Sequence, residues 1–160
     1  MTTANLEVRV EVSATPSQIW EVVRDLRRMP EWSPQCTAMR PVGPVRNGTF
    51  TVNMNRQGRK FWPTVSKVER FESNHAITFR TLTNDSVWEF EIATAATGSV
   101  LIERRRVPPS GTKRFSAKIV QHVLGGEAPF DTEMEDGMRT TLAKIKAAVE
   151  RNVAENGNQT

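Results

Sequence analysis

The feature that most constrains this chain is a row of short apolar and β-branched segments between residues 36 and 107, separated by turn-forming residues at regular distances. The turns fall at residues 41–48, 56–59, 72–74, 84–86 and 96–98. The predicted strands between them are Thr37–Pro41, Thr49–Asn55, Lys60–Phe71, His75–Thr83, Val87–Ala95 and Ser99–Val107. Because short hairpin turns rather than helices join these strands, we expect an antiparallel meander.

A further strand is predicted near the N-terminus, where apolar and polar residues alternate from residue 6 to residue 13. A helix should follow this strand. Thr15 can cap it, Pro16 suits its first position, and Gln18 completes a capping box with Thr15. Residues 27–33 are expected to form a second, short helix or a turn.

A long helix is predicted from Asp131 to Val153, because apolar residues recur there at three- and four-residue steps. The residues on this face are Met134, Met138, Thr141, Leu142, Ile145, Ala148 and Val149. The simpler interpretation is a core helix with ordinary gap-filling side chains. The alternative is a helix whose first half closes a cavity, since methionine adapts to irregular partners.

The order of these elements predicts an α+β fold, in which a seven-stranded curved antiparallel sheet wraps around the C-terminal helix. Only that helix is long enough to cover one face of the sheet, so the sheet must curl around it. The order is strand, two helices, six strands, helix. Residues 113–126 could add one loose helix. We expect a single domain over residues 1–160, with a frayed tail at 151–160.

The composition agrees with a globular protein that works inside the cell. The single cysteine, Cys36, excludes an internal disulfide and a cysteine-based zinc site. The sequence shows neither a signal peptide nor a membrane-spanning run, so we expect a cytoplasmic protein without a membrane span. The net charge of +4 is modest and its basic residues are spread out, so a nucleic-acid partner is not expected.

Large apolar residues alternate along the predicted strands and should line any pocket between the sheet and the helix. The alternating sets are Phe50, Val52 and Met54; Ile77, Phe79 and Thr81; and Trp88, Phe90 and Ile92. On the strand between, either Phe61 or Trp62 can point inward. So many large rings opposite a methionine-bearing helix suit an apolar cavity.

Few residues in the sequence point to catalysis. His75 begins a predicted strand and is expected to be an exposed turn residue, whereas His122 could anchor a ligand. Arg104 would meet a ligand oxygen if its strand face is concave, and would be solvated if that face is convex. The carboxylates at 131–136 suit the helix dipole better than a metal site. No metal and no cofactor are therefore expected.

Three segments resemble the helix-grip, START-like (SRPBCC) superfamily, and in particular its bacterial polyketide cyclase/dehydrase-like and coenzyme-Q-binding-like branch. They are VSATPSQIWEVVRDLRRMPEWSP after the first strand, FWPTVSKVERFE, and GMRTTLAKIKAAVE in the last helix. The resemblance runs from Leu6 to about Arg151. It implies a hydrophobic or amphipathic small-molecule ligand, with Trp32 near the mouth of the cavity. The candidate ligand-binding residues are Trp32, Phe50, Met54, Trp62, Phe79, Trp88, Phe90, Arg104, Phe115, His122, Met134, Met138 and Thr141.

The leading functional hypothesis is a protein that binds or carries a lipid, a quinone or a polyketide-like compound. The alternative is an aromatase or cyclase in which Arg104 or His122 polarises a carbonyl group. The absence of tyrosine leaves few polar groups for such chemistry, so binding is favoured over catalysis. A third hypothesis is an RNA- or ribosome-interacting, toxin-like protein, for which salt-dependent RNA binding would be expected.

Overall fold

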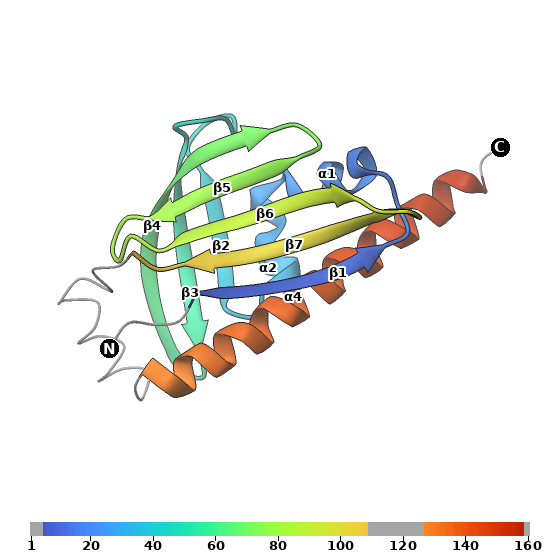
Figure 1. Cartoon of the computed structure of the whole chain (residues 1–160). Coiled ribbons are helices and arrows are strands. Elements are labelled where there is room, and N and C mark those ends of the chain that lie inside the picture. The colour runs from blue at the N-terminus through green and yellow to red at the C-terminus, as the bar shows by residue number, and fades with distance from the viewer. Residues whose placement is uncertain (1–4, 109–126, 159–160) are drawn as a thin grey trace.

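The computed structural model describes residues 5–108 and 127–158, and the side chains of residues 132–158 in the second range. A single curved sheet covers one side of the long helix α4, which runs next to β1 along the inner side of the sheet (Figure 1). The strands are β1 Leu6–Val12, β2 Cys36–Pro41, β3 Phe50–Gln57, β4 Lys60–Glu72, β5 Ala76–Thr81, β6 Val87–Thr94 and β7 Ser99–Arg106. The helices are α1 Pro16–Val23, η1 Leu26–Arg28, α2 Met29–Trp32 and α4 Glu127–Gly157.

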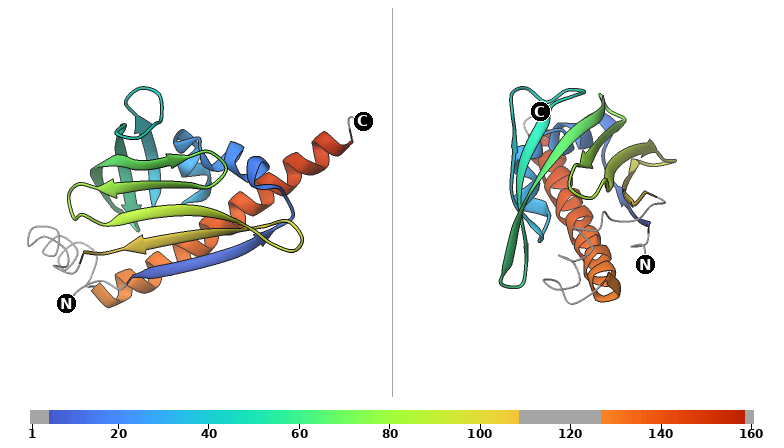
Figure 2. Two further views of the ribbon diagram at one scale, coloured as in Figure 1. Left: turned by 45° about the horizontal axis from the view of Figure 1, so that its top comes forward. Right: turned by 90° about the vertical axis from the view of Figure 1, so that its left-hand side faces the viewer.

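The sheet is antiparallel throughout, with the strand order β1-β7-β6-β5-β4-β3-β2. This order confirms the predicted meander, with β1 added beside the last strand. Figure 2 shows how far the sheet curls: β3 and β4 turn away from β1 and β7, and α4 lies between the two ends of the sheet. The predicted helix-grip fold is therefore confirmed. The loose helix proposed within residues 113–126 lies outside the described residues.

The start of α1 follows the sequence signal closely. The Thr15 side chain accepts a hydrogen bond from the Gln18 backbone N–H at 3.3 Å, and the Thr15 N–H donates to the Gln18 side chain at 2.8 Å. Pro16 occupies the first turn, where a missing N–H costs nothing. The capping box that the sequence predicts from Thr15 and Gln18 is therefore present.

The buried face of α4 is also the one that the spacing predicts, since all seven of its residues are buried. The opposite side of the helix is charged, with an ion pair of 2.7 Å between Glu135 and Arg139. Near the other end, Lys146 donates to the backbone carbonyl of Glu11 and pairs with Glu150. The helix extends beyond the predicted end at Val153 and reaches Gly157. Residues 150–157 include good helix formers such as Ala154 and Glu155.

Gly98 marks the closest backbone approach in the turn between β6 and β7. Its φ is +78°, and a Cβ atom there would overlap the carbonyl oxygen of Val12. The neighbouring Ser99 hydroxyl donates to the carbonyl of Ala14 at 2.8 Å. Only glycine allows the turn to lie against the end of β1 in this way.

We predict that Gly98→Ala destabilises the protein by about 3 kcal/mol, because left-handed strain adds to a backbone clash. Gly58→Ala is the matched control, since Gly58 also has a positive φ but has no neighbour within 4 Å. The control should cost only about 1–2 kcal/mol. Urea denaturation of both variants measures the difference, and equal losses would contradict the close packing of Gly98.

Candidate functional site

A cavity of about 130 Å³ lies between the concave face of the sheet, the short helix α2 and the first half of α4. Its lining residues come from β2 to β7, α2, the loops after α2 and β5, and α4. They are Met29, Ser33, Gln35, Cys36, Met39, Asn53, Asn55, Trp62, Thr64, Ser66, Phe79, Thr81, Asn84, Ser86, Trp88, Phe90, Glu103, Arg105 and Met134. The cavity is therefore lined by both apolar and polar side chains.

One wall of the cavity is a chain of hydrogen-bonded polar side chains on β3, β4 and β5. Asn53 Nδ2 donates to Ser66 Oγ at 2.9 Å and to Thr64 Oγ1 at 3.2 Å. Asn55 Nδ2 also donates to Thr64 Oγ1, at 2.9 Å, and Ser66 Oγ lies 3.5 Å from Thr81 Oγ1. Since Thr64 Oγ1 accepts two hydrogen bonds, its own hydrogen remains available to donate to a ligand.

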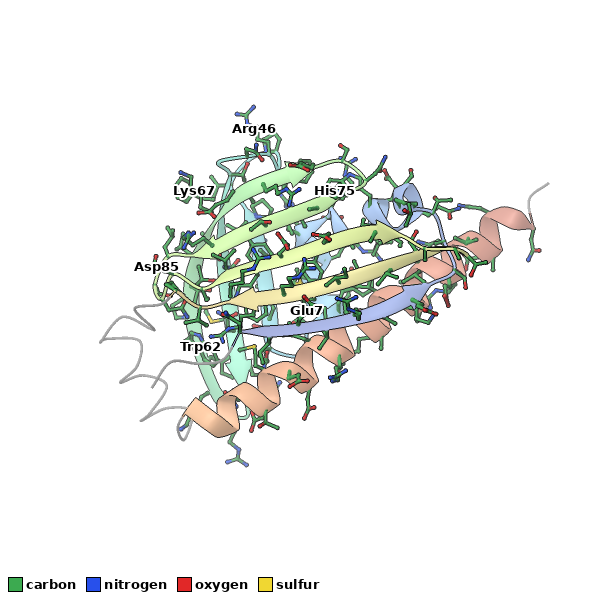
Figure 3. The ribbon with its side chains drawn as sticks, viewed as in Figure 1. Glu7, Arg46, Trp62, Lys67, His75 and Asp85 are labelled. Atoms are coloured by element: carbon green, nitrogen blue, oxygen red, sulfur yellow. The ribbon has the colours of Figure 1, made fainter. Side chains whose placement is uncertain are left out.

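Aromatic side chains form the apolar part of the cavity. Trp62, Phe79, Trp88, Phe90 and Met134 all line it, as the sequence predicts. Figure 3 labels Trp62 near the β3–β4 hairpin, toward the first turns of α4. Trp62 is thus the inward member of the Phe61–Trp62 pair, and Phe61 is 57% exposed. Whether these side chains touch a ligand remains a prediction.

Two charged residues of β7, Glu103 and Arg105, face the cavity although neither was predicted to do so. Both are buried, at 4% and 2% exposure. The Arg105 guanidinium lies 5.8 Å from the ring centroid of Trp88. Burial raises the pKa of the Glu103 carboxyl well above its ordinary value. Glu103 Oε2 is buried and has no hydrogen-bond partner within residues 5–108 and 132–158.

A buried carboxyl whose pKa is raised and whose Oε2 has no partner among the described residues has hydrogen-bonding capacity left for a ligand. Leaving such a group buried costs free energy, so it is rarely retained for packing alone. Glu103 can donate its proton to an oxygen, while the fixed positive charge of Arg105 favours electron-rich or anionic groups. Glu103 and Arg105 therefore give this end of the cavity a polar character.

The predicted inward orientation of Phe50, Val52 and Met54 is wrong. These β3 residues are 45%, 51% and 38% exposed on the outer face of the sheet. Their polar neighbours Thr51 and Asn53 point inward instead, and the Thr51 hydroxyl donates to Asn53 Oδ1 at 2.9 Å. The alternation of apolar and polar residues along β3 predicts two different faces but does not identify the buried face. Hydrogen bonds between the polar side chains lower the free-energy cost of burying the polar face.

The concave alternative for Arg104 is also wrong. Arg104 lies on the outer face, where its guanidinium pairs with Glu7 at 2.6 Å, Glu89 at 2.7 Å and Glu91 at 3.1 Å. Leu101 packs inside, as the convex alternative required. Both faces of β7 carry arginine, so charge alone could not identify the inner face.

The remaining candidates do not line the cavity or lie outside the described residues. Trp32 is buried in the core beneath the Arg28 guanidinium, which is 4.8 Å from its ring centroid, and it is not at the cavity. Met138 and Thr141 are buried on α4 without lining the cavity, and the Thr141 hydroxyl donates to the Gly137 carbonyl at 2.8 Å. The candidates outside the described residues are Phe115 and His122.

Cys36 lies at the cavity but lacks the features of a nucleophile. Burial raises the pKa of its thiol to about 11, and the sulfur lies 3.4 Å from the Ala38 carbonyl oxygen. The thiol is therefore protonated at neutral pH. Within the described residues, no group of three or more His, Cys, Asp or Glu side chains could hold a metal ion. No described helix is both long and apolar enough to cross a membrane.

Comparison with known proteins places this geometry among related folds. A family model described as polyketide cyclase/dehydrase and lipid transport matches residues 3–150. A search of curated proteins gives no significant match. All the structural neighbours compared below share less than 25% sequence identity with the chain, so they establish the fold alone.

The fold superposes on the di-domain aromatase/cyclase StfQ of the steffimycin biosynthetic pathway with a TM-score of 0.76 at 14% identity, over 96% of this chain and 52% of StfQ. The chain thus spans about half the length of StfQ. The Zhui aromatase/cyclase from Streptomyces sp. R1128 superposes with a TM-score of 0.73 at 14% identity, over 94% of this chain and 96% of Zhui. An AHSA1-like protein from Aeromonas hydrophila superposes with a TM-score of 0.62 at 13% identity, over 93% of this chain and 94% of the AHSA1-like protein.

The raised pKa of Glu103 predicts a characteristic pH dependence of stability. Between its ordinary value of 4.5 and its raised value, the folded state holds a proton that the unfolded state releases. The free energy of unfolding of the wild type, compared with that of Glu103→Gln, should therefore fall by about 1.4 kcal/mol per pH unit as the pH rises through this window. Above the window the difference should become constant.

Glu150→Gln is the control with the opposite sign. The Ser13 backbone N–H and then Lys146 lower the pKa of the Glu150 carboxyl, so its contribution is present above pH 4.5 and is lost as the pH falls. Urea denaturation at several pH values measures both differences. A pH-independent difference between wild type and Glu103→Gln would show that Glu103 is charged in the folded protein.

Proposed function

The chain belongs to the polyketide cyclase/dehydrase and lipid transport family, and we propose that it binds a compact, oxygen-bearing ring compound in the cavity between its sheet and α4. This proposal rests on the division of the cavity lining into an aromatic part and a polar part. Aromatic side chains such as Trp88 and Phe90 offer contact to a ring, and polar side chains such as Asn53 and Thr64 offer hydrogen bonds. A purely apolar ligand would leave the Thr64 hydroxyl hydrogen and Glu103 Oε2 without a partner in the cavity.

The size of the cavity favours a ring over a long acyl chain. An engineered apolar cavity of roughly 150 Å³ holds one benzene molecule, and the cavity here measures about 130 Å³. It therefore has room for about one ring without rearrangement of its walls. Among the ligand classes considered from the sequence, a polyketide-like or quinone-like compound fits better than a lipid. Two structural neighbours named as aromatase/cyclases support the same class.

The polar groups at two sides of the cavity suggest how the ligand is oriented. The Thr64 hydroxyl hydrogen and the Glu103 carboxyl can each donate to a ligand oxygen, from β4 and β7 respectively. Two donors on separate strands select a compound with oxygens on more than one side of its ring. The Arg105 guanidinium adds a fixed positive charge beside the Trp88 ring and favours an electron-rich substituent there.

Glu103 also favours a second candidate function, which is catalysis on the bound compound. A carboxyl whose pKa is raised by burial can, in its protonated form, transfer its proton to a carbonyl oxygen as general acid. The glutamine of Glu103→Gln can still donate a hydrogen bond but cannot transfer a proton in this way. Normal ligand binding with lost conversion in this variant would favour an enzyme, whereas a carrier would need Glu103 for binding alone.

We predict that the protein binds para-hydroxyacetophenone more tightly than para-cymene, which has the same heavy-atom connectivity but no oxygen. Loss of the hydrogen bonds should weaken binding about tenfold or more, since leaving buried donors unpaired costs about 1–3 kcal/mol. Titration followed by amide chemical shifts measures both affinities. Equal affinities, or no saturable shifts at cavity residues, would contradict the proposal.

Adjacent residues on opposite faces of β4 provide a matched pair of variants for the same titration. Trp62→Ala removes a cavity wall and should weaken binding of para-hydroxyacetophenone about tenfold, as expected for a lost aromatic contact. Phe61→Ala removes an exposed ring on the outer face and should leave binding unchanged. Equal effects would place the ligand elsewhere.

A further inference from the structure

The outer face of the sheet has two halves of different chemistry. Over β1, β7, β6 and β5, charged side chains neutralise one another. Arg104 pairs with three carboxylates, of Glu7, Glu89 and Glu91, and Arg80 of β5 pairs at 2.7 Å with Glu69, near the end of β4 that lies away from the β3–β4 hairpin. Figure 3 labels Glu7 on the side of the sheet that faces away from α4. This half is a network of compensated surface ion pairs.

Over β3 and β4 the same face is apolar and exposed. Strand register places Val52 opposite Val65 and Met54 opposite Pro63, so these side chains share one surface. The large apolar residues exposed on it are Phe50, Val52, Met54, Phe61 and Val65, at 38–57%. We call these five residues the β3–β4 patch. In the right-hand view of Figure 2, β3 and β4 run along the left of the molecule with α4 to their right.

Three basic side chains flank the β3–β4 patch, and none of them has a carboxylate partner within the part of the chain that the structure describes. Lys67 lies opposite Phe50 with its ammonium 5.7 Å from the ring centroid, and Arg56 lies opposite Phe61 with its guanidinium 5.8 Å from that ring. On β2, Arg40 lies opposite Val52. None of these three cations forms an ion pair with a described residue. The patch therefore joins apolar surface to uncompensated positive charge.

We propose that the β3–β4 patch docks the protein onto an anionic lipid surface. Exposed apolar patches of this kind mark interaction sites, and Phe, Val and Met flanked by Lys and Arg match the chemistry of an interfacial membrane contact, with apolar groups below the headgroups and cations beside the phosphates. A second copy fits poorly, because a two-fold contact would bring the same cations together. An acidic helix needs a groove, whereas this surface is the convex side of a curved sheet.

On β3 and β4, polar residues face the cavity and apolar residues face outward, so the two faces of these strands can serve different functions. Asn53 and Thr64 face the cavity, while Val52 and Val65 face outward from the neighbouring positions. Substitutions on the outer face can therefore remove docking without changing the cavity wall. Docking does not rest on the proposed ligand, and the two fail independently.

The test is co-sedimentation of the full chain with vesicles of phosphatidylcholine and phosphatidylglycerol in equal parts, and with vesicles of phosphatidylcholine alone. We expect binding to the anionic vesicles that weakens as salt rises. The double variant Arg40→Glu with Lys67→Glu should bind about 25-fold more weakly or worse, since each cation near the surface contributes about fivefold and the two effects multiply. Phe50→Thr with Val52→Thr should also lose binding, at unchanged net charge.

Arg24→Glu with Arg151→Glu is the matched control, because it makes the same change in net charge at two exposed residues, the C-cap of α1 and a residue of α4. It should bind nearly as the wild type does. Equal losses in the control and in the Arg40 and Lys67 variant would overturn the proposal in favour of general charge attraction. Absence of wild-type binding to anionic vesicles would also overturn it, and the patch would then remain a candidate site for an acidic protein.

Discussion

The hydrogen bonds that Asn53 makes across β3 and β4 decide which face of these strands can be buried. Asn53 accepts from Thr51 and donates to Thr64 and Ser66, so the polar face can line a cavity at low cost in desolvation. The apolar face is then left outside. Both the mixed polarity of the cavity and the exposed β3–β4 patch follow from this one choice.

The elements of the fold could be predicted from the sequence because they depend on local periodicity. The capping residues Thr15 and Gln18 make the predicted hydrogen bonds, and the three-and-four spacing on α4 identifies its buried face from Met134 to Val149. Such patterns report on neighbours within one helix or turn. The resemblance to the helix-grip superfamily rested on the same elements, and the strand pairing agrees with it.

The candidate site was less predictable, because the inner face of a strand depends on what packs against it. The sequence places Phe50 inward because large apolar residues are usually buried. It cannot orient Arg104, because Leu101 and Ile102 make both faces of β7 apolar. Glu103 and Arg105 were missed for the same reason. Leu101 is the residue that could have indicated them. Side chains two residues apart lie on the same face of a strand, so an inward Leu101 implies that Glu103 and Arg105 also point inward.

The most direct test of this account is the set of intermolecular nuclear Overhauser effects between bound para-hydroxyacetophenone and the aromatic side chains of the protein. The account predicts contacts from the probe to Trp62 and Trp88, which line the cavity, and none to Phe50 or Phe61, which lie on the outer face. Contacts to Phe50 and Phe61 without contacts to the two tryptophans would contradict it.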